Sequence, residues 1–188
     1  MNKHRFGIAL LAIVAMAFAF NACATKPQAA IDAAQAAVTA AVNAGADKYA
    51  PAELKTIQDN LTAALDQVTN KKYKEAALAL ATIKTDADNL LAAVPAKIEA
   101  VKTEALGLQT AVQTSLTEVK ALFDKNKWKI KKADRTAVDT EIKGLEAGLP
   151  EIQTALDGQD WLGAAAKATS LKDTAASILA KINTFLGK

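Results

Sequence analysis

Apolar residues recur through the body of the chain at alternating spacings of three and four, which is the pattern of amphipathic helices that bury one face. Alternation with a period of two, which would indicate strands, is not found. The pattern predicts six helices, at residues 28–46, 51–68, 73–94, 96–125, 138–157 and 161–186. We therefore expect an all-α protein built as an antiparallel helical bundle.

Residues that break helices mark the ends of several of these segments. Pro95 predicts a boundary because proline lacks the amide hydrogen that a helix interior requires. Gly158 suits the end of the fifth helix, whereas Gly148 and Pro150 inside that helix predict a bend or a split near Leu149.

The amino-acid composition supports slim helices that pack closely. Apolar residues make up 51% of the chain but aromatic residues only 5%, so the hydrophobic content is mostly alanine, with leucine, valine and isoleucine. Alanine, leucine, lysine and glutamate are strong helix formers, and the aromatic residues that favour strands are scarce.

The second half of the body resembles the first. One shift of the chain aligns Tyr73 with Trp161 and the Glu-x-Lys triplet at residues 53–55 with that at residues 141–143. Any two alanine-rich helices would align at apolar positions, but less readily at the triplets and the aromatic pair. We expect two copies of one helical hairpin. The predicted units cover residues 28–95 and 96–188.

The N-terminal segment has the three parts of a secretory signal peptide. Lys3 and Arg5 give a positive start, residues 7–20 form an apolar run, and small residues follow. The run is shorter than the roughly 18–20 residues of a membrane-spanning helix, so we expect a cleaved signal at residues 1–22.

Cys23 follows this segment and is the only cysteine in the chain. Residues 20–23, Phe-Asn-Ala-Cys, resemble the bacterial lipobox, although phenylalanine and asparagine stand where leucine and a smaller residue are usual. The resemblance implies a lipoprotein that begins at Cys23, which carries lipid such as palmitate, with residues 23–27 as a tether. The alternative is an ordinary signal peptidase that cuts after the Ala-x-Ala sequence at residues 22–24.

The residue after the cysteine bears on location. Ala24 stands where an aspartate resembles the inner-membrane retention signal of Gram-negative bacteria. We therefore expect a lipid-anchored protein of the cell envelope, at the outer membrane and facing the periplasm.

The sequence Tyr-Ala-Pro-x-x-Leu at residues 49–54, with Tyr-Lys-Glu-Ala at residues 73–76, resembles an uncharacterised helical domain family of Gram-negative envelope lipoproteins. That family carries a Gly-Asp-Tyr-x-x-Ala turn. Residues 70–72 here are Asn-Lys-Lys, whereas the second copy has Gly158 and Asp160 at this turn. The resemblance implies an envelope location and a helical scaffold.

Charge and residue content exclude several classes of function. Removal of Lys3 and Arg5 with the signal reduces the 23 basic residues to 21 against 20 acidic ones, a net charge of +1. Nucleic-acid binding, which requires a strongly basic domain, is not expected. The single histidine, His4, also lies in the signal, so zinc sites and nucleophile–histidine pairs are excluded from the rest. We expect no enzyme activity, metal or cofactor.

Basic residues gather around Trp128 in the longest connection between predicted helices. They are Lys125, Lys127, Lys129, Lys131, Lys132 and Arg135. One interpretation is contact with anionic lipid headgroups, lipopolysaccharide phosphates or glycan, with Trp128 at the interface. The other, which charged connections more often represent, is a solvated loop with Trp128 packed beneath it.

Two classes of function remain. The first is a structural or protein-interaction scaffold whose helices, in part as coiled coils, contact another envelope protein or peptidoglycan. The second is a carrier that holds a lipid or apolar small molecule in a cavity between helices. The terminal Lys188 suggests attachment to peptidoglycan, as in the murein lipoprotein, which also ends in lysine.

Overall fold

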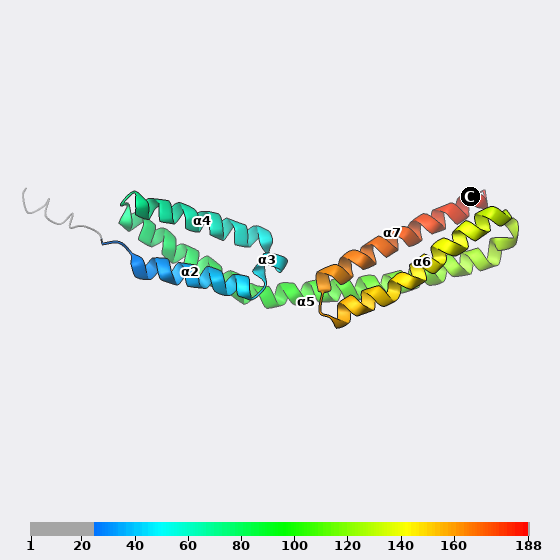
Figure 1. The fold of residues 1–188 in the computed structure, drawn as a ribbon, viewed down its shortest axis with the longest axis horizontal. Coiled ribbons are helices and arrows are strands. Elements are labelled where there is room, and N and C mark those ends of the chain that lie inside the picture. The colour runs from blue at the N-terminus through cyan, green and yellow to red at the C-terminus, as the bar shows by residue number, and fades with distance from the viewer. Residues whose placement is uncertain (1–24, 188) are drawn as a thin grey trace, which may run out of the picture. The chain divides into compact units, whose positions relative to one another are not determined.

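The computed structural model describes residues 25–187, which form α-helices, one 3-10 helix and no strand (Figure 1). The fold class is all-α, as the apolar pattern predicts. The α-helices are α2 (Gln28–Asn43), α3 (Ala46–Tyr49), α4 (Pro51–Thr69), α5 (Tyr73–Asn126), α6 (Lys132–Asp157) and α7 (Trp161–Phe185), and the 3-10 helix is η1 (Lys127–Lys129). The predicted signal at residues 1–22, Cys23 and Lys188 lie outside the described residues.

The described helices divide into two units, of which the first ends at Val94 and the second begins at Pro95. The first unit contains α2, α3, α4 and the N-terminal part of α5. In Figure 1 the long helices α2, α4 and α5 of this unit run side by side, and α3 lies where α2 passes into α4. The second contains the C-terminal part of α5 with α6 and α7, and buried side chains from all three helices form one apolar cluster.

Each long helix buries one face, at the positions where the apolar pattern places it. Ile57 and Leu80 lie in the interior of the first unit, and Leu145, Ile152 and Ile178 in that of the second. All buried side chains among the described residues are apolar. Full burial of one such side chain contributes about 1.5–3 kcal/mol, so these interior faces are the main source of stability.

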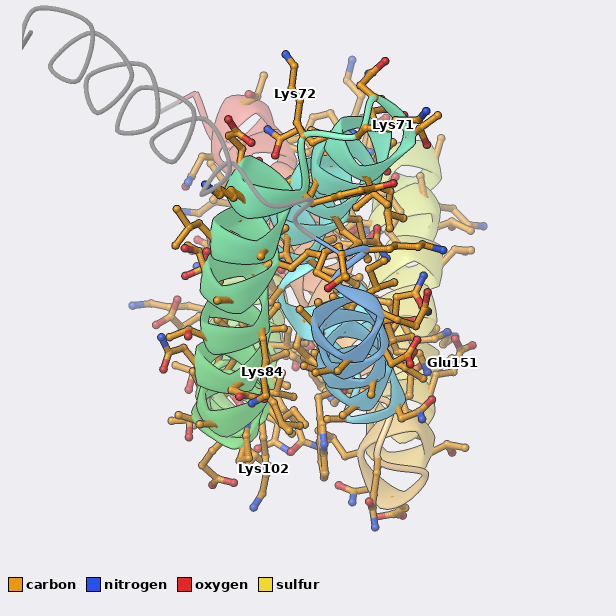
Figure 2. All side chains as sticks on the ribbon, turned by 90° about the vertical axis from the view of Figure 1, so that its left-hand side faces the viewer. Lys71, Lys72, Lys84, Lys102 and Glu151 are labelled. Atoms are coloured by element: carbon orange, nitrogen blue, oxygen red, sulfur yellow. The ribbon has the colours of Figure 1, made fainter. Side chains whose placement is uncertain are left out.

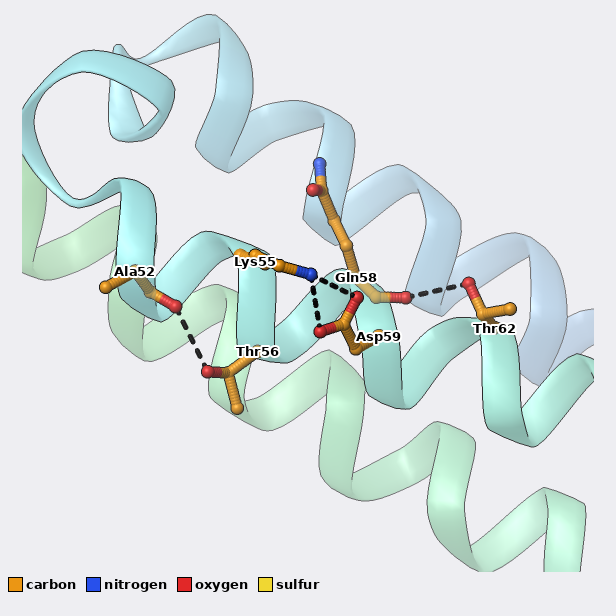
Figure 3. Close-up of polar contacts among 6 residues, drawn as sticks. All are labelled: Ala52, Lys55, Thr56, Gln58, Asp59 and Thr62. Atoms are coloured by element: carbon orange, nitrogen blue, oxygen red, sulfur yellow. Dashed lines mark hydrogen bonds and ion pairs between the residues drawn. The ribbon is translucent and has the colours of Figure 1, made fainter.

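The outer faces satisfy their polar groups locally, as α4 shows (Figure 3). The Lys55 ammonium donates to the Asp59 carboxylate at 2.8 Å. The hydroxyl groups of Thr56 and Thr62 donate to the carbonyls four residues earlier, each at 3.0 Å. These bonds let threonine, which otherwise favours strands, occupy the exposed face of a helix.

The predicted boundary at Pro95 is wrong, because α5 runs unbroken from Tyr73 to Asn126. An interior proline removes one hydrogen bond and crowds the carbonyl four residues earlier, here that of Leu91. Pro95 is exposed, so water can reach that side of the helix. The opposite face stays covered, since Val94 is buried.

The split predicted near Leu149 is also absent, because α6 is continuous through Gly148 and Pro150. Pro150 is exposed, as Pro95 is. Gly148 is buried, and a methyl group at this position would lie 2.6 Å from a methyl carbon of Leu171. Glycine therefore allows α7 to approach α6 closely.

The short helix α3 was not predicted. Gly45, just before it, has φ of 99°, a left-handed conformation that favours glycine. The amides of Lys48 and Tyr49 both donate to the Gly45 carbonyl at 3.0 Å, which closes the turn. Pro51 then begins α4 at the position where a missing amide hydrogen costs nothing.

The turn between α4 and α5 has the same geometry as the turn between α6 and α7. Lys71 and Gln159 have left-handed backbones with φ of 59° and 58°. The Lys72 amide donates to the Gln67 carbonyl and the Asp160 amide to the Ala155 carbonyl, both at 2.9 Å. Both turns are Schellman motifs, which close the end of a helix.

The two turns differ in how the next helix begins. The Asp160 carboxylate accepts a hydrogen bond from the Gly163 amide at 3.0 Å, which caps α7. Lys72 occupies the equivalent position before α5. Its ammonium group cannot accept a hydrogen bond, so Lys72 cannot cap α5 in this way. The aspartate that the second copy shares with the turn of the resembling family is therefore explained by the cap, whereas Gly158 has φ of −77° and the left-handed residue is Gln159.

We predict that Asp160→Ala destabilises the second unit by about 1 kcal/mol, because it removes the cap. Lys72→Asp should stabilise the first unit by about 1 kcal/mol, since aspartate here can cap α5. Urea unfolding measures both changes, by circular dichroism for all helices and by tryptophan fluorescence for the second unit, which holds Trp128 and Trp161.

The matched control is Asp173→Ala, which removes an exposed aspartate from the middle of α7 and should leave the unfolding midpoint unchanged. An Asp160→Ala chain with the parent fluorescence midpoint would show that the cap contributes nothing.

Candidate functional site

The basic connection, residues 125–135, joins α5 to α6. α5 ends at Asn126, whose side-chain amide donates to the Leu122 carbonyl at 2.9 Å. The chain continues through η1, becomes extended at Ile130, and enters α6 at Lys132.

Ile130 holds this connection on the second unit. Its side chain is only 4% exposed and belongs to the same apolar cluster as Phe123 and Val138. Trp128, two residues earlier, is 73% exposed. The interpretation in which Trp128 packs beneath the connection is therefore wrong, because Ile130 occupies the interior instead.

A charged residue lies against the exposed indole ring. The Lys129 ammonium is 5.0 Å from the centre of the Trp128 ring, within the range of a cation–π interaction. The connection thus presents an aromatic ring and a cation together at its surface.

An open groove of about 530 Å³ lies beside the connection, between α5 and α6. Phe123 and Ile142 contribute the apolar part of its lining, and most of its other lining residues are charged. Lys127, Lys132 and Arg135 belong to both the groove and the basic connection.

The carboxylates of this groove are engaged by lysines. Lys120 bonds Glu146 at 2.5 Å, Lys143 bonds Asp139 at 2.7 Å, and Lys127 bonds Asp124 at 3.0 Å. The hydrogen bond that Lys120 donates to Glu146 raises the pKa of Lys120 above its ordinary value, and the bond that Lys143 donates to Asp139 does the same for the pKa of Lys143. Both lysines are therefore cationic at neutral pH.

The other basic residues of the connection form no ion pair with a carboxylate of the described chain. They are Lys125, Lys129, Lys131, Lys132 and Arg135. Asp134 is the one acidic residue of the connection, against six basic ones. Positive charge is therefore concentrated here and is not neutralised within the second unit.

The corresponding connection of the first unit has no such charge. Residues 44–50, between α2 and α4, contain one acidic and one basic residue, Asp47 and Lys48. Of these two connections, only that of the second unit carries an excess of positive charge.

Other acidic residues of the described helices form ion pairs with lysines. Asp88 pairs with Lys84 at 2.5 Å, and Glu141 pairs with Lys181. A hydrogen bond from Lys167 lowers the pKa of Glu151. Within residues 25–187, no group of three or more histidine, cysteine or acidic side chains could hold a metal ion.

The structure brings together groups that sequence reasoning missed. Lys143 and Asp139 lie one helical turn apart, a spacing from which their ion pair could have been predicted. Lys120 and Glu146 belong to different helices, and nothing in the sequence indicates that they meet. The groove itself follows from the packing of α5 against α6.

Comparison with known proteins gives one match to a domain model, and that match indicates no chemistry. Residues 29–106 match the model of a family described as a domain of unknown function, DUF4398. The match supports the resemblance to an uncharacterised domain family. No curated protein and no solved structure matches the chain. The basic connection lies outside the matched residues. In the described part of the chain, no helix has both the length and the apolar character needed to cross a bilayer.

We predict that Ile130→Ala destabilises the second unit by about 2–4 kcal/mol, because it leaves a cavity in the cluster. Trp128→Ala should change the stability by less than about 0.5 kcal/mol, since the ring is exposed. Urea unfolding followed by circular dichroism compares the two variants. Equal losses of stability would contradict the assignment of Ile130 as the anchor.

Proposed function

We propose that this chain is a lipid-anchored scaffold of the bacterial cell envelope and has no enzyme activity. One observation carries the proposal: both described units are three long helices packed around an interior whose buried residues are all apolar, with charged groups at the surface. Such a body offers long, stable helical faces to partners. The partners that fit this role are another envelope protein or peptidoglycan, with Lys188 as a candidate point of attachment.

The lipid anchor rests on the N-terminal sequence. Cys23 follows a secretory signal, and the described helices begin only a few residues later, at Gln28. A tether this short would hold the first unit next to the membrane that contains the lipid. Ala24 favours the outer membrane, with the helical body in the periplasm.

We also infer that the two units arose by duplication of one hairpin. Positions that the sequence alignment pairs have matching burial: Leu54 and Ile142 are both 5% exposed, and Ala76 and Ala164 are both fully buried. The left-handed residues Lys71 and Gln159 fall at the same register. Chance alignment of two alanine-rich helices would explain the apolar matches, but it explains two equal turns less readily.

The carrier alternative is less well supported. A carrier needs an apolar cavity, whereas the groove beside α6 is lined mainly by charged side chains. Alanines such as Ala168 and Ala175 fill the interface of α7 without exposed surface, which indicates close contact between helices.

The first test concerns the anchor. Expressed in a Gram-negative host, the chain should incorporate labelled palmitate, and its intact mass should correspond to an acylated protein that begins at Cys23. Cys23→Ser should abolish the label. An unlabelled parent chain that begins after Ala24 would show ordinary signal cleavage and refute the anchor.

The second test separates scaffold from carrier. Chemical crosslinking of the full chain in intact cells, followed by mass spectrometry, should recover envelope proteins or glycan joined to exposed lysines of the helices. Lipids extracted from the purified chain should be the same for the parent and for a variant with altered interior, Leu145→Ala. A stoichiometric apolar molecule that this variant loses, without crosslinked partners, would establish the carrier.

A further inference from the structure

The basic connection stands apart from the scaffold because five of its six basic residues form no ion pair with a carboxylate of the described chain. Asp124 pairs with Lys127 of the connection, whereas Asp139 and Glu146 pair with Lys143 and Lys120, which lie outside it, so these two carboxylates do not neutralise the connection. Lys125, Lys129 and Lys131 are exposed along the connection. Like charges held this close repel one another, which favours an anionic partner outside the chain.

The exposed Trp128 ring indicates which kind of anionic partner fits the connection. An indole ring in water forfeits the free energy that burial of its large apolar surface provides, and Trp128 is 73% exposed. Ile130, not Trp128, holds the connection on the core, so the fold does not need the ring in this position. Indole rings prefer the boundary between water and hydrocarbon, where the ring is buried and its N–H stays hydrated.

We infer that the basic connection is a docking surface for a bilayer rich in anionic phospholipid. The phosphates of the headgroups lie near the ammonium groups, and Trp128 enters the interfacial layer between them. The cations lie before and after Trp128 along the connection, so an extended array of phosphates can meet more than one of them. A single free phosphate would meet only a few. The inference goes beyond the scaffold role and does not depend on the lipid at Cys23.

The experiment requires a signal from the connection itself, because the N-terminal segment can also hold the chain on a vesicle. Trp161→Phe leaves Trp128 as the only tryptophan of the full chain. With vesicles of equimolar phosphatidylcholine and phosphatidylglycerol, emission from Trp128 should shift to shorter wavelength and be quenched by brominated acyl chains. Phosphatidylcholine alone should give neither effect, and 1 M salt, which reduces the Debye length to about 3 Å, should reverse both.

Two pairs of lysines provide matched charge variants in this background. Lys125→Gln with Lys131→Gln should lower the equilibrium constant for the Trp128 contact about 25-fold, since each cation near an anionic surface contributes about fivefold. Lys129 is kept, because its ammonium touches the ring and its loss would itself change the emission.

The control pair is Lys71→Gln with Lys72→Gln, which changes the net charge equally. Figure 2 shows these two lysines at the turn between α4 and α5, and both are exposed. The control should lower the constant by less than about twofold. Circular dichroism should show equal helix content in all variants, because none of the four lysines forms an ion pair with a described carboxylate.

Four results would overturn the inference. They are an unshifted Trp128 on anionic vesicles, an equal shift on neutral vesicles, equal effects of the two lysine pairs, and a shift of the same size produced by pyrophosphate without vesicles. The last result would assign the connection to soluble phosphate. A chain that keeps both vesicle binding and the Trp128 shift with Cys23→Ser would refute only the lipid anchor as the main attachment and would support this inference.

Discussion

The apolar stripe on every long helix must be covered by other helices, and the rest of the described structure depends on this constraint. A stripe wider than about 100° is only partly covered by one neighbour, whereas two neighbours cover it fully. Three long helices in each unit meet this requirement. The alanines of α2, among them Ala34 and Ala41, allow the helix backbones to approach closely, so the interior is filled without large side chains at these positions.

Because all buried residues of the described chain are apolar, its charged side chains lie at the surface. Ion pairs there contribute little to stability, typically 0–1 kcal/mol, because water screens them. Their more important effect is to determine where charge remains. Glu146 and Asp139 are engaged by lysines of α5 and α6, and the cations of the basic connection other than Lys127 have no such pair. The basic connection can thus attract anions because the neighbouring carboxylates are already paired with other lysines.

The two units share one arrangement of helices but differ in their turns and connections. Both have the same Schellman turn, with Lys71 and Gln159 in the left-handed conformation. The residues that follow these turns differ. The Asp160 carboxylate accepts a hydrogen bond from the next helix, whereas the Lys72 side chain can only donate. The connections on the other side differ more, one nearly neutral and one strongly basic. Positions that face the interior are constrained by packing, while turns and connections are free to acquire new roles.

The amino-acid sequence by itself determined the helical class, most helix ends and the residues of the interior, because helical periodicity and turn preferences act between residues close in the chain. Tertiary structure alone decided three points. Pro95 lies within a helix because its ring faces solvent, and Lys120 meets Glu146 because α5 packs on α6. Trp128 is exposed because Ile130 takes the interior position. Each depends on which face a neighbouring helix covers, and local sequence does not encode the position of that neighbour.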